Sequence, residues 1–182
     1  IGVADLIEAE QALVDYDVDL AILFSALPTE SFKTLARVEQ SVFAIMAPGH
    51  PLADSEKLSL SQCVEFPLAL HDSSFSVGQY LGAQAHSSRL SLKPVIKSNS
   101  FILLQNYIMN SNAVGFEIEI GLGESDLNGL VKRPLTLNKL NKISVQLIQL
   151  RGRTLSVAAA KFAEQIGAVF MAMSVENGDV IH

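Results

Sequence analysis

The stretch VFAIMAPGHPLADSEKLSL, residues 42–60, changes character halfway along. Its first six residues are all apolar, which predicts a short buried strand. The strand must end at Pro48-Gly49-His50-Pro51, because proline has no backbone N–H to donate to a β-ladder. We expect His50 to lie at the surface of this turn. The stretch therefore marks a point where the chain leaves one group of elements and enters another.

The middle of the chain alternates between predicted strands and helices. Apolar runs predict strands at 66–72, 92–98 and 113–120, and helices lie between them at 73–88 and 99–112. Ser73 or Ser74 can cap the first helix, and Asn99 or Ser100 the second. This βαβαβ order predicts a lobe with a parallel, doubly wound sheet.

The two ends of the chain supply incomplete α/β material. They comprise a helix at 5–15, a strand at 20–24, a strand at 143–150 and a helix from 155 to about 173. The strand at 20–24 is apolar on both faces, which is typical of a parallel sheet covered by helices.

This arrangement predicts a middle lobe inserted into an outer one. The outer lobe comprises residues 1–46 and 131–182, and the inner lobe residues 47–130. Residues 42–47 and 130–135 are then two adjacent strands that cross between the lobes. The Asn128-Gly129 turn precedes the return crossing.

Composition excludes several classes of protein. Of the 182 residues, 49% are apolar and 18% charged, so a substantial core is expected. With a formal charge of −6, the chain lacks the excess of basic residues that is typical of a protein that binds nucleic acid by itself. Cys63 is the single cysteine, which fits a reducing compartment and a buried thiol. The sequence shows neither an export leader nor an apolar run long enough to span a bilayer, so we expect a cytoplasmic protein without a membrane partner.

Six segments, taken in this order and spacing, resemble one known family. They are DVDLAIL (17–23), VFAIMAPGHPLA (42–53), LSLSQCVEFPLAL (58–70), AVGFEIEIG (113–121), GLVKRPL (129–135) and RGRTLSVAAAKFAEQI (151–166). Together they resemble the effector-binding domain of LysR-type transcriptional regulators, from Ile1 to about Phe170. The resemblance implies an α/β fold of two Rossmann-like lobes joined by two crossing strands, similar to periplasmic binding proteins.

The same resemblance implies a function. The chain would sense a small organic metabolite, work as a dimer or tetramer, and reach DNA only through a winged helix-turn-helix domain upstream. That domain is not in this sequence, which begins at Ile1, and neither is the strand-helix unit that opens the regulatory domain in the family. A solute-binding protein of a transport system and an enzyme on a similar scaffold remain alternatives. An upstream export leader would indicate the first, and turnover of a metabolite would indicate the second.

Neither catalysis nor metal binding is predicted. The sequence contains no G-x-S-x-G elbow for a nucleophilic serine. His50, His71, His86 and His182 are too far apart for a metal-ligand motif. We therefore expect no enzyme, no cofactor and no metal site. Arg151 and Arg153 are expected to be solvated or paired with a carboxylate.

Ligands of open parallel sheets bind beyond the carboxyl ends of strands, where helix N-termini converge. This rule and the resemblance predict effector-binding residues at three strand ends and on the strand at 113–120: Phe24, Ser25, His71, Asp72, Ser73, Ser74, Ser98, Asn99, Ser100, Phe116 and Glu117. The hydroxyl groups and helix-end amides favour a small organic anion.

Alternative roles remain open at these positions. The serines and Asn99 can simply cap helices, Phe116 can belong to the core, and His71 can be a solvated loop residue. Glu117 and Glu119 stand where the family usually has aliphatic residues. Glu117 would repel an anion unless it pairs with a cation.

Overall fold

The computed structural model of the chain describes residues 6–24, 30–72, 76–122, 127–136 and 143–176. The chain forms two compact units, one made of Ile1–Glu39 with Ile143–His182 and the other of Gln40–Lys142. Among the described residues, no helix is long and apolar enough to cross a membrane.

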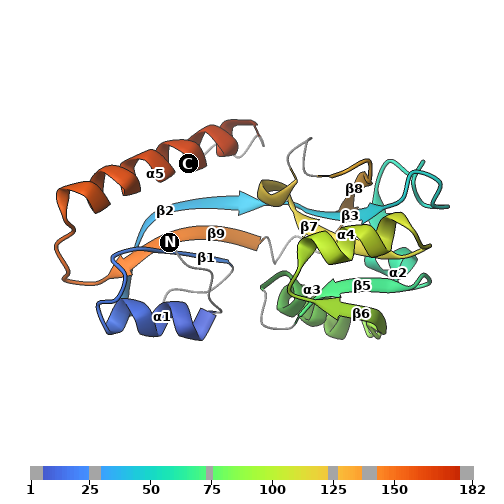
Figure 1. Ribbon diagram of the computed structural model, residues 1–182, viewed down its shortest axis with the longest axis horizontal. Helices are drawn as coiled ribbons and strands as arrows, with labels where there is room; N and C mark the ends of the chain where they lie inside the picture. The colour runs from blue at the N-terminus through green and yellow to red at the C-terminus, as the bar shows by residue number, and fades with distance from the viewer. Residues whose placement is uncertain (1–5, 25–29, 73–75, 123–126, 137–142, 177–182) are drawn as a thin grey trace. The chain divides into compact units, whose positions relative to one another are not determined.

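The first unit contains a three-stranded sheet with a helix on each side (Figure 1). Its elements are α1 (Leu6–Val14), β1 (Ala21–Phe24), β2 (Phe32–Gln40), β9 (Ile143–Leu150) and α5 (Val157–Glu176). The strand order is β1-β9-β2. Leu13, Leu23, Phe32 and Ile148 form a buried cluster to which α1, β1, β2 and β9 each contribute one side chain.

The direction of β1 differs from the prediction. This strand pairs antiparallel with β9, with Leu23 opposite Gln146, whereas a parallel sheet was expected. Only one of its four residues is fully buried. The expectation was wrong because so short an apolar run does not specify the direction of its neighbour. The structure also contains β2, which the sequence analysis did not predict.

The second unit contains a six-stranded sheet with the order β4-β8-β3-β7-β5-β6. Its elements are β3 (Val42–Met46), β4 (Leu58–Ser59), α2 (Leu60–Cys63), β5 (Leu68–His71), α3 (Ser76–Ser87), β6 (Pro94–Ser98), α4 (Phe101–Met109), β7 (Val114–Ile118), the 3₁₀ turn η1 (Glu119–Gly121) and β8 (Val131–Thr136). Strand β5 is parallel to both β6 and β7. The predicted parallel βαβαβ arrangement is therefore confirmed.

The two expected crossing strands lie side by side. Strand β3 pairs antiparallel with β8, with Phe43 opposite Pro134 and Met46 opposite Val131. By contacts both strands belong to the second unit, because β3 also pairs with β7 and β8 with β4. The boundaries of the compact units, at 39/40 and 142/143, therefore differ from the predicted lobe boundaries at 46/47 and 130/131.

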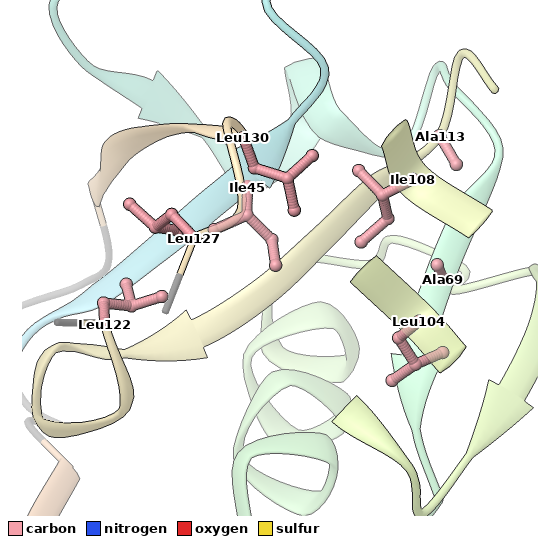
Figure 2. Close-up of a cluster of buried hydrophobic side chains, with 8 residues drawn as sticks. All are labelled: Ile45, Ala69, Leu104, Ile108, Ala113, Leu122, Leu127 and Leu130. Atoms are coloured by element: carbon pink, nitrogen blue, oxygen red, sulfur yellow. The ribbon is translucent and has the colours of Figure 1, made fainter. Parts of the chain in front are cut away.

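The core of the second unit lies between α4 and the sheet (Figure 2). It comprises Ile45, Ala69, Leu104, Ile108, Ala113, Leu122, Leu127 and Leu130. Gly115 lies in the same layer on β7, in register with Ile45 on one side and Ala69 on the other. A methyl group added at Gly115 would lie 2.5 Å from Ile108 Cδ1, so glycine leaves room for the Ile108 side chain in its present position.

The turn that follows β3 is formed as predicted, but its histidine is buried. His50 is 5% exposed, and its ring centroid lies 4.5 Å from that of Phe66. The backbone N–H of Leu52 donates to His50 Nδ1 at 3.1 Å. Burial lowers the pKa of His50, and an interaction with the Asn112 backbone opposes this effect. The expectation of a surface histidine was wrong, because the imidazole completes the turn from inside.

Two smaller predictions agree with the structure. Cys63 is fully buried, and desolvation raises the pKa of its thiol to about 12. Arg153 forms an ion pair with Asp19, donates to the Val18 carbonyl oxygen at 2.9 Å, and lies over the ring of Tyr16. Arg151 donates to two backbone carbonyl oxygens, those of Glu30 and Phe32.

Candidate functional site

The carboxyl ends of β5, β6 and β7 meet at one edge of the six-stranded sheet, because the three strands are parallel. His71 ends β5 and lies in register with Ser98, which ends β6. On the other side of β5, Ala69 pairs with Gly115 of β7. Two residues further along, His71 therefore lies beside Glu117. The fold thus brings together three predicted residues that are far apart in sequence.

His71 and Glu117 form a direct pair. His71 Nε2 lies 3.0 Å from Glu117 Oε2, and each side chain is 12% exposed. Glu117 Oε1 also accepts a hydrogen bond from the backbone N–H of Ile118 at 3.0 Å. The imidazole of His71 and the carboxylate of Glu117 are therefore within hydrogen-bonding distance of each other. Glu117 thus has a hydrogen-bonding partner on the neighbouring strand, His71.

Two residues that the sequence analysis did not select support this pair. The ring of Phe101, the first residue of α4, stacks on His71 with a centroid distance of 6.0 Å and an interplanar angle of 22°. A methyl group at Gly121 would lie only 3.3 Å from Glu117 Cγ, so glycine leaves room for the glutamate side chain. The position of Phe101 directly after a predicted cap could have indicated its role, whereas nothing in the sequence signals that of Gly121.

The loop between β6 and α4 is held by hydrogen bonds. Ser100 is the N-cap of α4, and its Oγ accepts from the backbone N–H of Leu103 at 3.3 Å. Ser98 Oγ accepts from the Ser100 N–H at 3.0 Å, and Ser98 O accepts from the Asp72 N–H at 3.1 Å. Of the two predicted caps, Ser100 takes this role and Asn99 does not. The positive end of the α4 dipole is therefore next to His71, where it favours negative charge by about 0.3–1 kcal/mol.

The other predicted site residues lie elsewhere in the structure or outside its described part. Phe116 is 3% exposed, which agrees with the alternative of a core residue. Phe24 ends β1 of the first unit and is half-buried. Ser25, Ser73 and Ser74 lie outside the described residues. Within the part of the chain that the structure describes, no three histidine, cysteine, aspartate or glutamate side chains are grouped as metal ligands would be.

The comparisons with known proteins identify a family. The family model described as LysR substrate binding domain matches residues 2–171. No curated protein matches the chain.

Solved structures share the fold at low identity. HinK, a LysR family transcriptional regulator from Pseudomonas aeruginosa, superposes with a TM-score of 0.74 at 19% identity, covering 91% of this chain and 58% of its own. The effector binding domain of QuiR in complex with shikimate gives 0.72 at 16%, covering 91% and 79%. The regulatory domain of Synechocystis PCC6803 CcmR in complex with 2-PG gives 0.72 at 15%, covering 90% and 78%.

The chain corresponds to only part of the length of some of the matching proteins. The chain spans 58% of the length of HinK and of a second Pseudomonas aeruginosa protein, described as a putative LysR family regulator. At identities below 20% the superpositions show a common fold. The family match extends over nearly the whole sequence. The chain belongs to the family of LysR substrate-binding domains.

Proposed function

We propose that this chain is the effector-sensing domain of a LysR-type transcriptional regulator and that it binds a small organic metabolite. The observation that carries the proposal is the family match over residues 2–171. The complexes of QuiR with shikimate and of CcmR with 2-PG support a small-molecule ligand. Because the chain has a formal charge of −6, DNA binding is assigned to a separate domain upstream.

The site includes the group at the carboxyl ends of β5, β6 and β7. His71, Ser98, Ser100 and Glu117 come together there beside the N-terminus of α4. Phe24, Ser25, Asp72, Ser73, Ser74, Asn99 and Phe116 remain part of the proposal as predicted from the sequence. The ligand is a small organic anion, because the helix-end amides of α4 favour negative charge and Glu117 is engaged in a hydrogen bond with His71.

Binding acts on transcription by shifting the conformation of the domain. Coupling free energies between a ligand site and a distant output are typically about 1–3 kcal/mol, or about 5–150-fold in affinity. The regulator works in the cytoplasm as a dimer or tetramer, and the domain itself is not an enzyme.

The test begins with a thermal-shift screen of metabolites in which each carboxylate is paired with its uncharged amide. Carboxylates should raise the melting temperature more than their amides do. The affinity of the best compound is then measured by calorimetry for the wild type, Ser100→Ala and Glu117→Gln. Ser91→Ala, on an exposed loop outside this group, is the matched control.

Losing a hydrogen bond to a charged ligand costs about 1.5–3 kcal/mol, so Ser100→Ala should bind about 10–150-fold more weakly. Ser91→Ala should match the wild type. Affinity must be compared at a temperature where each variant is folded, since loss of the cap also destabilises α4. Equal affinity in Ser100→Ala, Glu117→Gln and the control would place the ligand elsewhere.

A further inference from the structure

A cavity of about 290 Å³ that is partly open to solvent lies at the surface of the second unit. It is lined by Ser59, Leu60, Ser61, Gln84, Ser88, Leu90 and Thr136. None of these residues belongs to the group around His71 and Glu117, and the proposed function assigns no role to any of them.

One wall of the cavity is fixed by hydrogen bonds. Strand β4 pairs in parallel with β8, and this register places Ser59 opposite Thr136. Ser59 caps α2 in a reciprocal arrangement: Ser59 Oγ accepts from the Gln62 N–H at 3.3 Å, and Gln62 Oε1 accepts from the Ser59 N–H at 2.9 Å. Ser59 Oγ also lies 2.9 Å from Ser61 Oγ. This wall is therefore preorganised rather than loose.

The lining also contains a buried carboxamide. Gln84 on α3 is 3% exposed and lines the cavity. The hydroxyl group of Tyr80 lies near this carboxamide without accepting a hydrogen bond from it. Among the described residues, nothing accepts a hydrogen bond from Gln84 Nε2. A buried donor without an acceptor is destabilising, so an acceptor supplied by a ligand would be favourable here.

The chemistry of the lining restricts the class of ligand. The seven residues supply four hydroxyl groups, one carboxamide and two leucine side chains, and none is charged. An ion would lose hydration without meeting an opposite charge. The cavity is at the lower end of the range of about 300–1,000 Å³ that is typical of ligand sites.

We propose that this cavity is a second binding site, for an uncharged polyhydroxylated compound no larger than a monosaccharide. The ligand would place an apolar edge against Leu60 and Leu90 and present acceptors to Gln84. Its hydroxyl groups would meet Ser88 and Thr136. The site is separate from the one in the proposed function and could exist even if that proposal failed.

The test uses NMR of the full 182-residue chain, with D-glucose, D-ribose and myo-inositol as probes. The side-chain amide signals of Gln84 report directly on the cavity. We expect saturable shifts of these signals with at least one probe. Gluconate, which resembles glucose in size but is charged, should bind at least about tenfold more weakly.

Two variants test the location. Ser88→Leu places a bulky side chain at the rim and should abolish the shifts, whereas Ala83→Leu, at an exposed position on α3, should leave them unchanged. Thr136→Val keeps the shape but removes one hydroxyl group, and should weaken binding by about three- to tenfold. Ser88 and Thr136 are both exposed, so both variants should fold.

Three results would overturn the proposal. They are the absence of a saturable shift with all three probes up to 100 mM sugar, equal binding of gluconate and glucose, and undiminished binding to Ser88→Leu. The ligand of the proposed function is an anion tested with Ser100→Ala, so failure of either proposal is distinguishable from failure of the other.

Discussion

Replacing Gly115 by alanine tests the packing that positions the candidate site. Gly115 lies on β7 between β3 and β5, under Ile108 of α4. The new methyl group would lie 2.5 Å from Ile108 Cδ1, 3.1 Å from Ile45 Cγ1 and 3.4 Å from the carbonyl oxygen of Ala69. The most favourable separation of two carbon atoms is about 3.5–4.0 Å, so the first two contacts are too close.

The expected change in the free energy of unfolding of Gly115→Ala is the difference of two effects. Overpacking a well-packed core costs about 1–3 kcal/mol, because neighbouring side chains or strands must move. Removing a glycine stabilises a protein by about 0.4–1 kcal/mol through the lower entropy of the unfolded chain. Ile108 Cδ1 is the end of a flexible side chain and can move, but the new methyl group would still lie 3.1 Å from Ile45 Cγ1. We therefore expect Gly115→Ala to lower the free energy of unfolding by about 1.3 kcal/mol, the difference of the central values, and by no more than about 2.6 kcal/mol.

Urea denaturation followed by circular dichroism measures this change. Gly82→Ala is the matched control, because a methyl group at Gly82 on α3 would meet no atom within 4 Å. That control should stabilise the chain by about 0.4–1 kcal/mol. Ile108→Val removes the atom nearest to the new methyl group and should cost about 0.5–1.5 kcal/mol by itself.

The double variant of Gly115→Ala with Ile108→Val identifies which contact causes the destabilisation. If the clash with Ile108 Cδ1 dominates, adding Gly115→Ala to Ile108→Val should cost at least about 0.5 kcal/mol less than adding it to the wild type. Our account of this packing would be refuted if Gly115→Ala stabilised the chain as Gly82→Ala does. Strict additivity of the two substitutions would show that another contact is responsible.

Three further predictions concern other parts of the chain. Burial lowers the pKa of His50 in the folded state, so below the ordinary histidine pKa of about 6.5 the unfolded chain binds more protons than the folded chain. The free energy of unfolding should therefore fall as the pH drops from 7 to 5, and it should fall by less in His50→Gln. Cys63 should react with a thiol reagent at pH 8 only after unfolding, because its thiol is buried and has a pKa of about 12, and rapid reaction of the native chain would contradict this. Ile7 of α1 is 77% exposed, so Ile7→Lys should weaken self-association in light scattering if α1 is the contact. Glu56→Lys, at an exposed position outside α1, should leave self-association unchanged.

The sequence was most informative where apolar periodicity and chain order agreed. The runs that became β5, β6 and β7 were separated by helical segments, and only a parallel arrangement lets such helices cross back over the sheet. The strand at 42–46 was equally clear, because prolines fix where it ends. Ser100 was predicted as one of two caps, since its hydroxyl group precedes a strongly apolar helix.

The sequence was least informative where tertiary contacts decide the outcome. Residues 32–40 mix charged and apolar side chains, yet they form β2 because β9 lies beside them. His50 follows Pro-Gly, a pattern typical of a surface turn, but the ring of Phe66 covers it. The sequence did not show which side chain would lie beside Glu117, because its partner His71 comes from a different strand, β5.

The core and the candidate site of the second unit are consecutive rows on one face of the same sheet. Ile45, Gly115 and Ala69 occupy adjacent strands in register under α4. Side chains on a strand alternate between faces, so the residues two positions along lie on the same face. On β7 and β5 these residues are Glu117 and His71, and Phe101 of the same helix covers the histidine.

This geometry connects the packing at Gly115 to the hydrogen-bonded pair of His71 and Glu117. The 3.0 Å separation between His71 Nε2 and Glu117 Oε2 depends on the register of β5 against β7, which the Ala69–Gly115 pairing fixes. The stacking of Phe101 on His71 depends on how closely α4 approaches the sheet, and glycine at 115 permits that approach. A methyl group at Gly115 displaces the Ile108 side chain, which packs α4 against the sheet. Because hydrogen bonds weaken steeply as their geometry is lost, a ligand that uses His71 should bind Gly115→Ala more weakly even where the fold survives.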